Sequence, residues 1–88
     1  MIRSIGPAVA FCRISVDADG FNFTVIYGGY ENGFFCCIPN HGIGCDLSSP
    51  ADTFYNTEAL QRHGLSAVAA KAIATAIMET VEKMRGKY

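Results

Sequence analysis

The chain of 88 residues is poor in charge, and the charges it has are nearly balanced. Charged residues make up 17% of the sequence and apolar residues 50%, a composition that excludes a disordered tail or a charged coiled coil. Seven Lys and Arg oppose eight Asp and Glu, so the net charge is −1. Nucleic-acid modules usually carry a basic stripe, and without one a nucleic-acid-binding sheet-plus-helix domain is only an alternative.

The sequence also lacks the short motifs of common active sites. It contains no Cys-x-x-Cys pair, no Gly-x-Gly-x-x-Gly fingerprint and no Walker loop with its lysine. The pair Gly28-Gly29 therefore indicates a turn or a bulge rather than a phosphate-binding loop. A domain of this length is also expected to offer little concave volume for a substrate. These absences favour a protein that is not an enzyme and needs no cofactor.

Long apolar runs are missing as well, and none approaches the roughly 18 residues of a transmembrane helix. Near the N-terminus, Pro7 and Arg13 limit one apolar run to about five residues, whereas a secretion signal needs roughly 7–15. We therefore expect a cytoplasmic protein that has no membrane partner and keeps its four cysteines reduced. Its size and its cysteine content are typical of small bacterial proteins of unknown function.

Alternating apolar and polar residues in the first half predict β-strands. The dipeptides Asp19-Gly20 and Asn32-Gly33 separate such segments, and both are typical of type I′ hairpin turns, which need positive φ at both central residues. Residues 39–42 form a third turn. The predicted strands cover residues 8–16, 21–27, 33–38 and, as a short fourth strand, 43–47. The first half is therefore predicted to form an antiparallel β-meander of three to four strands.

The second half changes to a helical period. A short helix is predicted near residues 57–63, opened by Asn56, although residues 49–52 offer an alternative start, and Gly64 ends it. Ser66 then caps a long helix that reaches about Arg85. One apolar stripe runs along the long helix: Leu65, Ala69, Ile73, Ile77, Val81 and Met84. The predicted fold class is α+β, with this helix packed on the meander in one domain spanning residues 1–88.

Counting outward from the predicted turns gives the register of the sheet. Cys12 then faces Tyr27 in the first hairpin, and Tyr27 faces Ile38 in the second. One face of the sheet is almost wholly apolar, and we expect it to receive the long helix. Its residues are Ala10, Cys12, Ile14, Val16, Phe23, Val25, Tyr27, Cys36 and Ile38.

The opposite face of the sheet carries a second apolar cluster at one end. Its members are Phe11, Ile26, Tyr30, Phe35 and Cys37. Monomers rarely leave such a patch in water, so either residues 48–63 fold over it or it forms an interface. Val68 and Met78 of the long helix lie off the main stripe and extend the candidate interface. We predict an interaction or assembly module that forms a homodimer through the sheet face, the helix flank or both, or else binds another protein.

Cys37, His41 and Cys45 form the pattern most like a metal site. Zinc needs ligands that converge within about 2.3 Å of one point. If residues 40–42 form a three-residue turn, Cys37 lies opposite Cys45, but His41 stands at the tip, about 13 Å away along the strand. The sequence therefore predicts no metal site, and a zinc-binding or thiol-dependent domain that uses these three residues is a further alternative.

Overall fold

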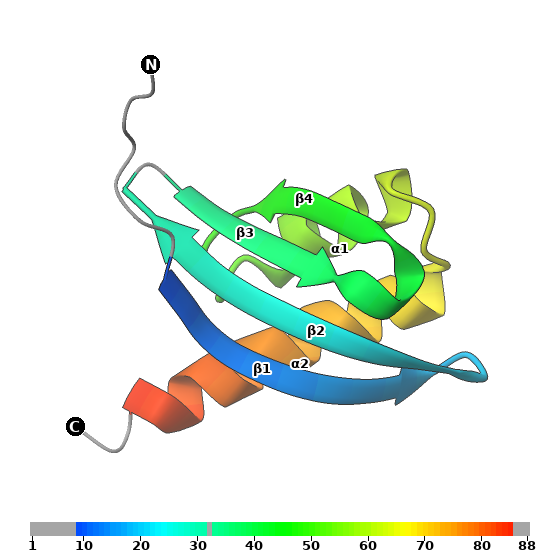
Figure 1. The fold of residues 1–88 in the computed structure, drawn as a ribbon, viewed down its shortest axis with the longest axis horizontal. Coiled ribbons are helices and arrows are strands. Elements are labelled where there is room, and N and C mark those ends of the chain that lie inside the picture. Colours follow the sequence, from blue (N-terminus) through cyan, green and yellow to red (C-terminus); the bar gives the residue numbers. More distant parts are fainter. Residues whose placement is uncertain (1–8, 32, 86–88) are drawn as a thin grey trace.

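A four-stranded sheet precedes two helices in the computed structural model, which describes residues 9–31 and 33–85. The elements in chain order are β1 (Val9–Ala18), β2 (Phe21–Tyr30), β3 (Gly33–Ile38), the 3-10 turn η1 (Pro39–His41), β4 (Ile43–Leu47), α1 (Thr53–Arg62) and α2 (Ala67–Arg85). Neighbouring strands are antiparallel and lie in the order of the sequence, so the sheet is a meander (Figure 1). The predicted α+β fold is confirmed.

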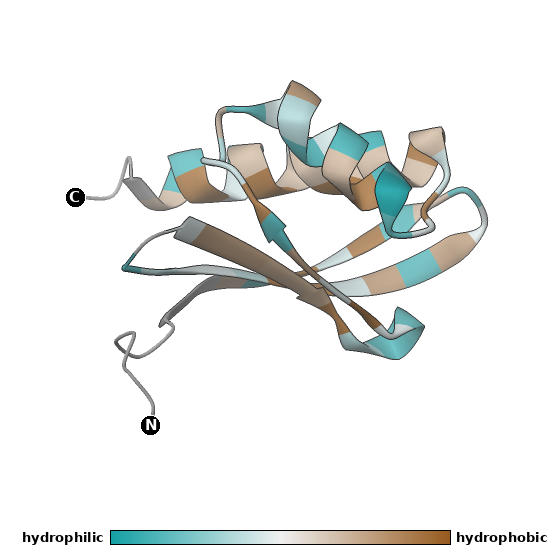
Figure 2. Ribbon diagram, turned by 90° about the horizontal axis from the view of Figure 1, so that it is seen from above, coloured by the Kyte–Doolittle hydropathy of each residue, from teal (hydrophilic) through white to brown (hydrophobic). Residues whose placement is uncertain are grey.

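Both helices lie on the same face of the sheet (Figure 2). α2 packs against β1 and against α1, and α1 also packs against β4. The idea that residues 48–63 fold over the second face of the sheet is therefore wrong, because the helical part of that segment lies beside α2. This placement leaves the second face without a helix over it.

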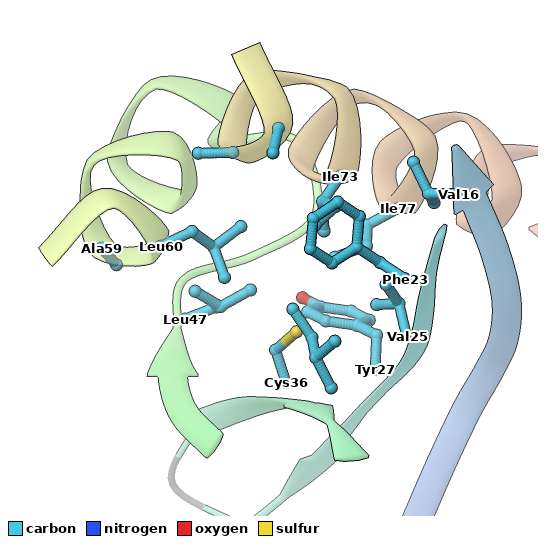
Figure 3. Packing of buried hydrophobic residues seen from close by; sticks show 13 residues of the cluster. Val16, Phe23, Val25, Tyr27, Cys36, Leu47, Ala59, Leu60, Ile73 and Ile77 are labelled. Atoms are coloured by element: carbon cyan, nitrogen blue, oxygen red, sulfur yellow. The ribbon is translucent and has the colours of Figure 1, made fainter. Parts of the chain in front are cut away.

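The core lies between the inner face of the sheet and the two helices (Figure 3). Val16, Phe23, Val25, Tyr27, Cys36 and Ile38 of the predicted inner face are buried, and Cys12 and Ile14 pack at the edge of this cluster. Ile73 and Ile77 of α2 are fully buried in the same cluster, as is Leu60 of α1. The Tyr27 hydroxyl donates a hydrogen bond to the Ser48 carbonyl oxygen at 2.9 Å, so the polar end of this large side chain is satisfied.

The first hairpin has the predicted register. Cys12 pairs with Tyr27, and the other pairs follow in order down to the turn. Asp19 and Gly20 form that turn with φ of 53° and 81°, the positive values that a type I′ turn requires at both positions. The turn residues and the alternation of the strands therefore favour the same pairing.

A β-bulge lies near the start of β1. Ala10 pairs with Gly28 and Cys12 pairs with Tyr27, so one extra residue, Phe11, stands in β1 between the two pairs. A bulge was expected at Gly28-Gly29 of β2. The bulge lies opposite that part of β2, but the inserted residue belongs to β1. The side chains of residues 9–11, including those of Ala10 and Phe11, lie outside the part that the structure describes.

The second hairpin differs from the prediction by two residues. Tyr27 pairs with Cys36 rather than with Ile38, and Tyr30 pairs with Gly33. Gly33 is therefore the first residue of β3. The Tyr30 ring covers Gly33, lying 3.6 Å from the position that a Cβ atom would take, an ordinary van der Waals contact. Since the shift is an even number of residues, each side chain keeps its predicted face.

α1 begins at Thr53 rather than near residue 57. Asp52 caps it by accepting a hydrogen bond from a first-turn backbone N–H at 3.3 Å. Asn56, the predicted cap, is fully buried within the helix. Its side chain accepts a hydrogen bond from the Ser48 N–H at 2.7 Å and donates one to the Ser49 carbonyl at 3.0 Å. Asn56 therefore holds the connection between β4 and α1, a long-range role that local capping preference does not reveal.

α2 is flanked by the predicted residues. Gly64 takes a φ of 104°, the left-handed conformation expected after a helix. The Ser66 hydroxyl accepts a hydrogen bond from the Ala69 N–H at 3.1 Å and donates one to the Asp19 carboxylate at 2.7 Å. The cap thereby joins the start of α2 to the first hairpin turn. No helix within the described residues has the length and hydropathy needed to cross a membrane.

Replacing Ile77 by Ala should lower the free energy of unfolding by about 2–5 kcal/mol, because the truncation leaves a cavity among buried neighbours. Urea denaturation followed by circular dichroism measures the loss. Phe54 is 75% exposed, so Phe54→Ala is the control and should change the stability by no more than about 0.5 kcal/mol. Equal losses for the two variants would contradict the packing of α2 on the sheet.

Candidate functional site

The face of the sheet away from the helices carries four half-buried side chains that we call the open-face patch: Ile26, Tyr30, Phe35 and Cys37. All four come from the central strands β2 and β3, and Ile26 pairs directly with Cys37. The rings of Tyr30 and Phe35 meet edge to face, with 6.2 Å between their centroids. The structure therefore brings together four of the five interface residues predicted for this face, and the side chain of Phe11 lies outside the described part.

Tyr30 connects the open-face patch to β4. Its hydroxyl donates a hydrogen bond to a carboxylate oxygen of Asp46 at 2.7 Å, with its ring lying across Gly33. This hydrogen bond, which holds the proton on the phenol, raises the pKa of Tyr30, and desolvation and the carboxylate charge add smaller contributions. A negative charge therefore borders the patch at this edge.

Polar residues border the apolar part of this face on both edge strands and towards the first hairpin turn. Arg13 lies on the edge strand β1, and Asp46 lies on the opposite edge strand β4. Towards the first hairpin turn, the Asn22 side-chain amide donates hydrogen bonds to the Ser15 hydroxyl at 2.7 Å and to the Asp17 carboxylate at 2.8 Å. The apolar patch therefore occupies one end of the face and has opposite charges on its two sides.

Val68 and Met78, the two candidates on the long helix, do not join the open-face patch. They belong to α2, which lies on the other side of the sheet (Figure 2). Val68 is 62% exposed, whereas Met78 is half-buried. The residues predicted for a single extended interface therefore lie on two separate surfaces.

Cys37, His41 and Cys45 do not converge on one point. Cys45 pairs with Cys36, so the predicted pairing of Cys45 with Cys37 is wrong. The turn between β3 and β4 contains η1 and then Gly42 at a φ of 68°, four residues instead of three. A slip of one residue moves a side chain to the other face of a sheet. Among the residues that the structure describes, no three His, Cys, Asp or Glu side chains are grouped to hold a metal ion.

His41 and its neighbour Asn40 instead complete the hydrogen bonding of β2. The Nε2 atom of His41 lies 2.9 Å from the Asn22 carbonyl oxygen, and its ring lies 4.3 Å from that of Phe23, centroid to centroid. The Asn40 side chain accepts a hydrogen bond from the Thr24 N–H and donates one to the Asn22 carbonyl, both at 3.0 Å. η1 thereby supplies hydrogen-bond partners for β2 beyond the end of β3, a structural role for the histidine that its spacing from the cysteines does not indicate.

Three cysteines lie on the inner face in one row across the sheet, with Tyr27 between the first and the second. Cys12 pairs with Tyr27, Tyr27 with Cys36, and Cys36 with Cys45. Burial raises the pKa of the Cys36 thiol to about 12, and it also raises the pKa values of Cys12 and Cys45. A nucleophilic cysteine needs a lowered pKa, so these shifts run in the direction expected of thiols that pack in a core.

A groove of about 610 Å³ lies beside β4 and α1, which is more concave volume than the sequence predicts. Its lining includes Cys45, Tyr55, Arg62 and His63. Within the described residues, no hydrogen bond joins His63 to a cysteine. In this part of the chain the groove therefore shows no hydrogen-bonded cysteine–histidine pair.

Cys36 should make the fold sensitive to alkaline pH. Burial raises the pKa of its thiol from 9.0 to about 12, so the stability that the thiol contributes is complete below pH 9. That stability is lost as the pH rises from 9 towards 12, by up to about 1.4 kcal/mol per pH unit. Denaturant unfolding from neutral to strongly alkaline pH measures this slope.

Cys36→Ala should flatten the alkaline slope without abolishing it, because burial also raises the pKa of Tyr27. Ile38→Val is the control, since it removes apolar volume from the same core but no titrating group, and it should keep the full slope. An unchanged slope in Cys36→Ala would contradict the assignment to this thiol.

The comparisons with known proteins identify a family. No curated protein and no solved structure shows significant similarity to the chain. A family model described as "Family of unknown function (DUF6618)" matches residues 1–85. Because this match covers nearly the whole chain, the protein belongs to that family.

Proposed function

We propose that this protein is a small, non-enzymatic assembly module that binds a second copy of itself through the open-face patch. The observation that carries the proposal is the position of both helices on one face of the sheet, which leaves the patch on the other face without a helix over it (Figure 2). Apolar clusters on an uncovered face commonly mark interfaces in soluble proteins. A second copy would remove the patch from water.

The open-face patch is complementary to itself when two sheets pack face to face. A two-fold axis that runs parallel to the strands, between β2 and β3, sets β2 of one copy over β3 of the other. Phe35 then lies over Gly28 of the second copy, because these two residues form one row of the sheet. Ile26 lies over Cys37 of the second copy for the same reason. A large side chain thus meets a smaller one in each row, which favours close packing.

The same arrangement brings opposite charges together at both edges. β1 of one copy lies over β4 of the other, so Arg13 approaches Asp46 of the second copy. The rows of these two residues are two positions apart, about 7 Å along the strands, a separation that an arginine side chain spans. Two such pairs would border the apolar centre and fix the orientation of the two copies.

A zinc site and a nucleic-acid surface have less support. Cys37 and Cys45 lie on opposite faces of the sheet, and the charges of the open face are mixed instead of forming a basic stripe. The proposal includes a location in the cytoplasm of a bacterium, because a reducing compartment keeps a half-buried thiol such as Cys37 free.

Phe35→Glu should lower the average molecular mass measured by light scattering, because it places two carboxylates in the apolar centre of the pair. Phe54→Glu is the matched control: Phe54 is exposed on α1, away from the open face, so its change should leave the mass unaltered. Circular dichroism verifies that both variants are folded.

The Cys37 thiol supplies a second measurement, because Cys12, Cys36 and Cys45 all lie on the inner face. Iodoacetamide should modify Cys37 more slowly at millimolar than at low micromolar protein concentration, and Phe35→Glu should remove this protection. Tandem mass spectrometry locates the modified residue. Modification of Cys37 at a rate independent of concentration, together with an unaltered mass for Phe35→Glu, would refute the proposal.

A further inference from the structure

A second surface with a self-complementary pattern runs along α2. Its residues line a groove of about 430 Å³, and we call this surface the α2 flank: Val68, Lys71, Ala72, Thr75, Ala76 and Glu79. Ile73 and Ile77 of the same helix are buried in the core, so the α2 flank is a different side of the helix. Val68 is 62% exposed, which places a large apolar side chain in water at one end of the groove.

The charges of the α2 flank are symmetric about Thr75. Lys71 precedes Thr75 by one helical turn and Glu79 follows it by one, so the two charges lie about 6 Å from Thr75 in opposite directions along the axis. Within the described residues, neither Lys71 nor Glu79 forms an ion pair with another side chain. As far as the described residues are concerned, both charges are therefore available to a partner.

We infer that the α2 flanks of two copies of this chain pack against each other as antiparallel helices, about a two-fold axis near Thr75. This alignment sets Lys71 of each copy opposite Glu79 of the other, which gives two interchain ion pairs. A parallel alignment would instead set Lys71 against Lys71 and Glu79 against Glu79. The charge pattern therefore selects a second copy as the occupant and fixes its direction.

The side chains between the charges permit close contact of the two helices. Ala72 and Ala76 are small and half-buried, so the helix backbones can approach closely along the groove. Val68 lies about one turn before Lys71, and the last turns of α2 of the second copy would cover it. The contact thus removes from water the large exposed apolar side chain of this surface.

The α2 contact does not rest on the proposed function of the open face. The helices lie on the inner side of the sheet and the open-face patch on the outer side, so a copy bound to one surface leaves the other free (Figure 2). A chain with two self-complementary surfaces assembles beyond a dimer. The two contacts are separable by mutation.

The chain carrying Phe35→Glu isolates the α2 contact. It should form a dimer in sedimentation equilibrium at low ionic strength, where exposed charges are least screened. Adding Lys71→Glu or Glu79→Lys should weaken this dimer by about tenfold or more, because each change sets two like-charged pairs across the axis. Arg62→Glu and Glu58→Lys on α1 change the net charge by the same amounts outside the α2 flank and should leave the dimer intact.

An equimolar mixture of the two charge variants is the sharpest test. The Lys71→Glu chain is acidic at both positions and the Glu79→Lys chain is basic at both, so the mixture should form a heterodimer although each variant alone is a monomer. The double variant, Lys71→Glu with Glu79→Lys, should also dimerise because it restores both opposite-charge pairs.

A Phe35→Glu chain that stays monomeric at every concentration overturns the α2 contact, and so does a mixture with no more dimer than its components. A different result separates the two proposals. If the Phe35→Glu chain has the same mass as the unmodified chain while the charge variants have a lower mass, the proposal for the open face fails and the α2 contact stands.

Discussion

Burial of one sheet face under two helices is the constraint on which the rest of the structure depends. Tyr27 and Cys36 point towards Ile73 and Ile77, and all four are fully buried. Because side chains alternate along a strand, the same strands direct every second residue away from the helices. Alternation does not require those residues to be apolar, since the end of the face near the first turn is polar. The apolar composition of the open-face patch is therefore a separate property, and it is what favours a partner.

The same burial separates three of the four cysteine thiols from the proposed binding surfaces. Cys12, Cys36 and Cys45 lie on the inner face, where desolvation raises the pKa values of their thiols. His41, the histidine of the pattern most like a metal site, contacts Asn22 and packs on an aromatic ring. The described outer surfaces carry apolar area with a few charges on either side, and this pattern is the basis of both proposed contacts.

The predictable parts of the fold are those in which several residues favour one structure. The first hairpin has its type I′ turn residues as well as its alternation, and α2 has a long apolar stripe and a cap. The register counted from a turn at Asn32-Gly33 was wrong because Gly33 is a strand residue, with the Tyr30 ring lying across it. The helix cap predicted at Asn56 was wrong because the hydrogen-bond partners of Asn56 lie just after β4, outside any local pattern. Most of the open-face patch was still predictable, since an even shift of register preserves faces.

The turn at η1 shows how one residue separates two functional interpretations. With a three-residue turn, Cys45 would lie beside Cys37 on the open face, and two thiols would stand in the patch. The observed four-residue turn sends Cys45 inward and sets Gly44 opposite Cys37 instead. Gly44 shares its row with Arg13 on the far edge strand, and in the proposed pair the two lie over one another. The missing side chain at Gly44 leaves room for the arginine stem to pass towards Asp46. The same slip that separates Cys37 from Cys45 therefore favours the face-to-face contact.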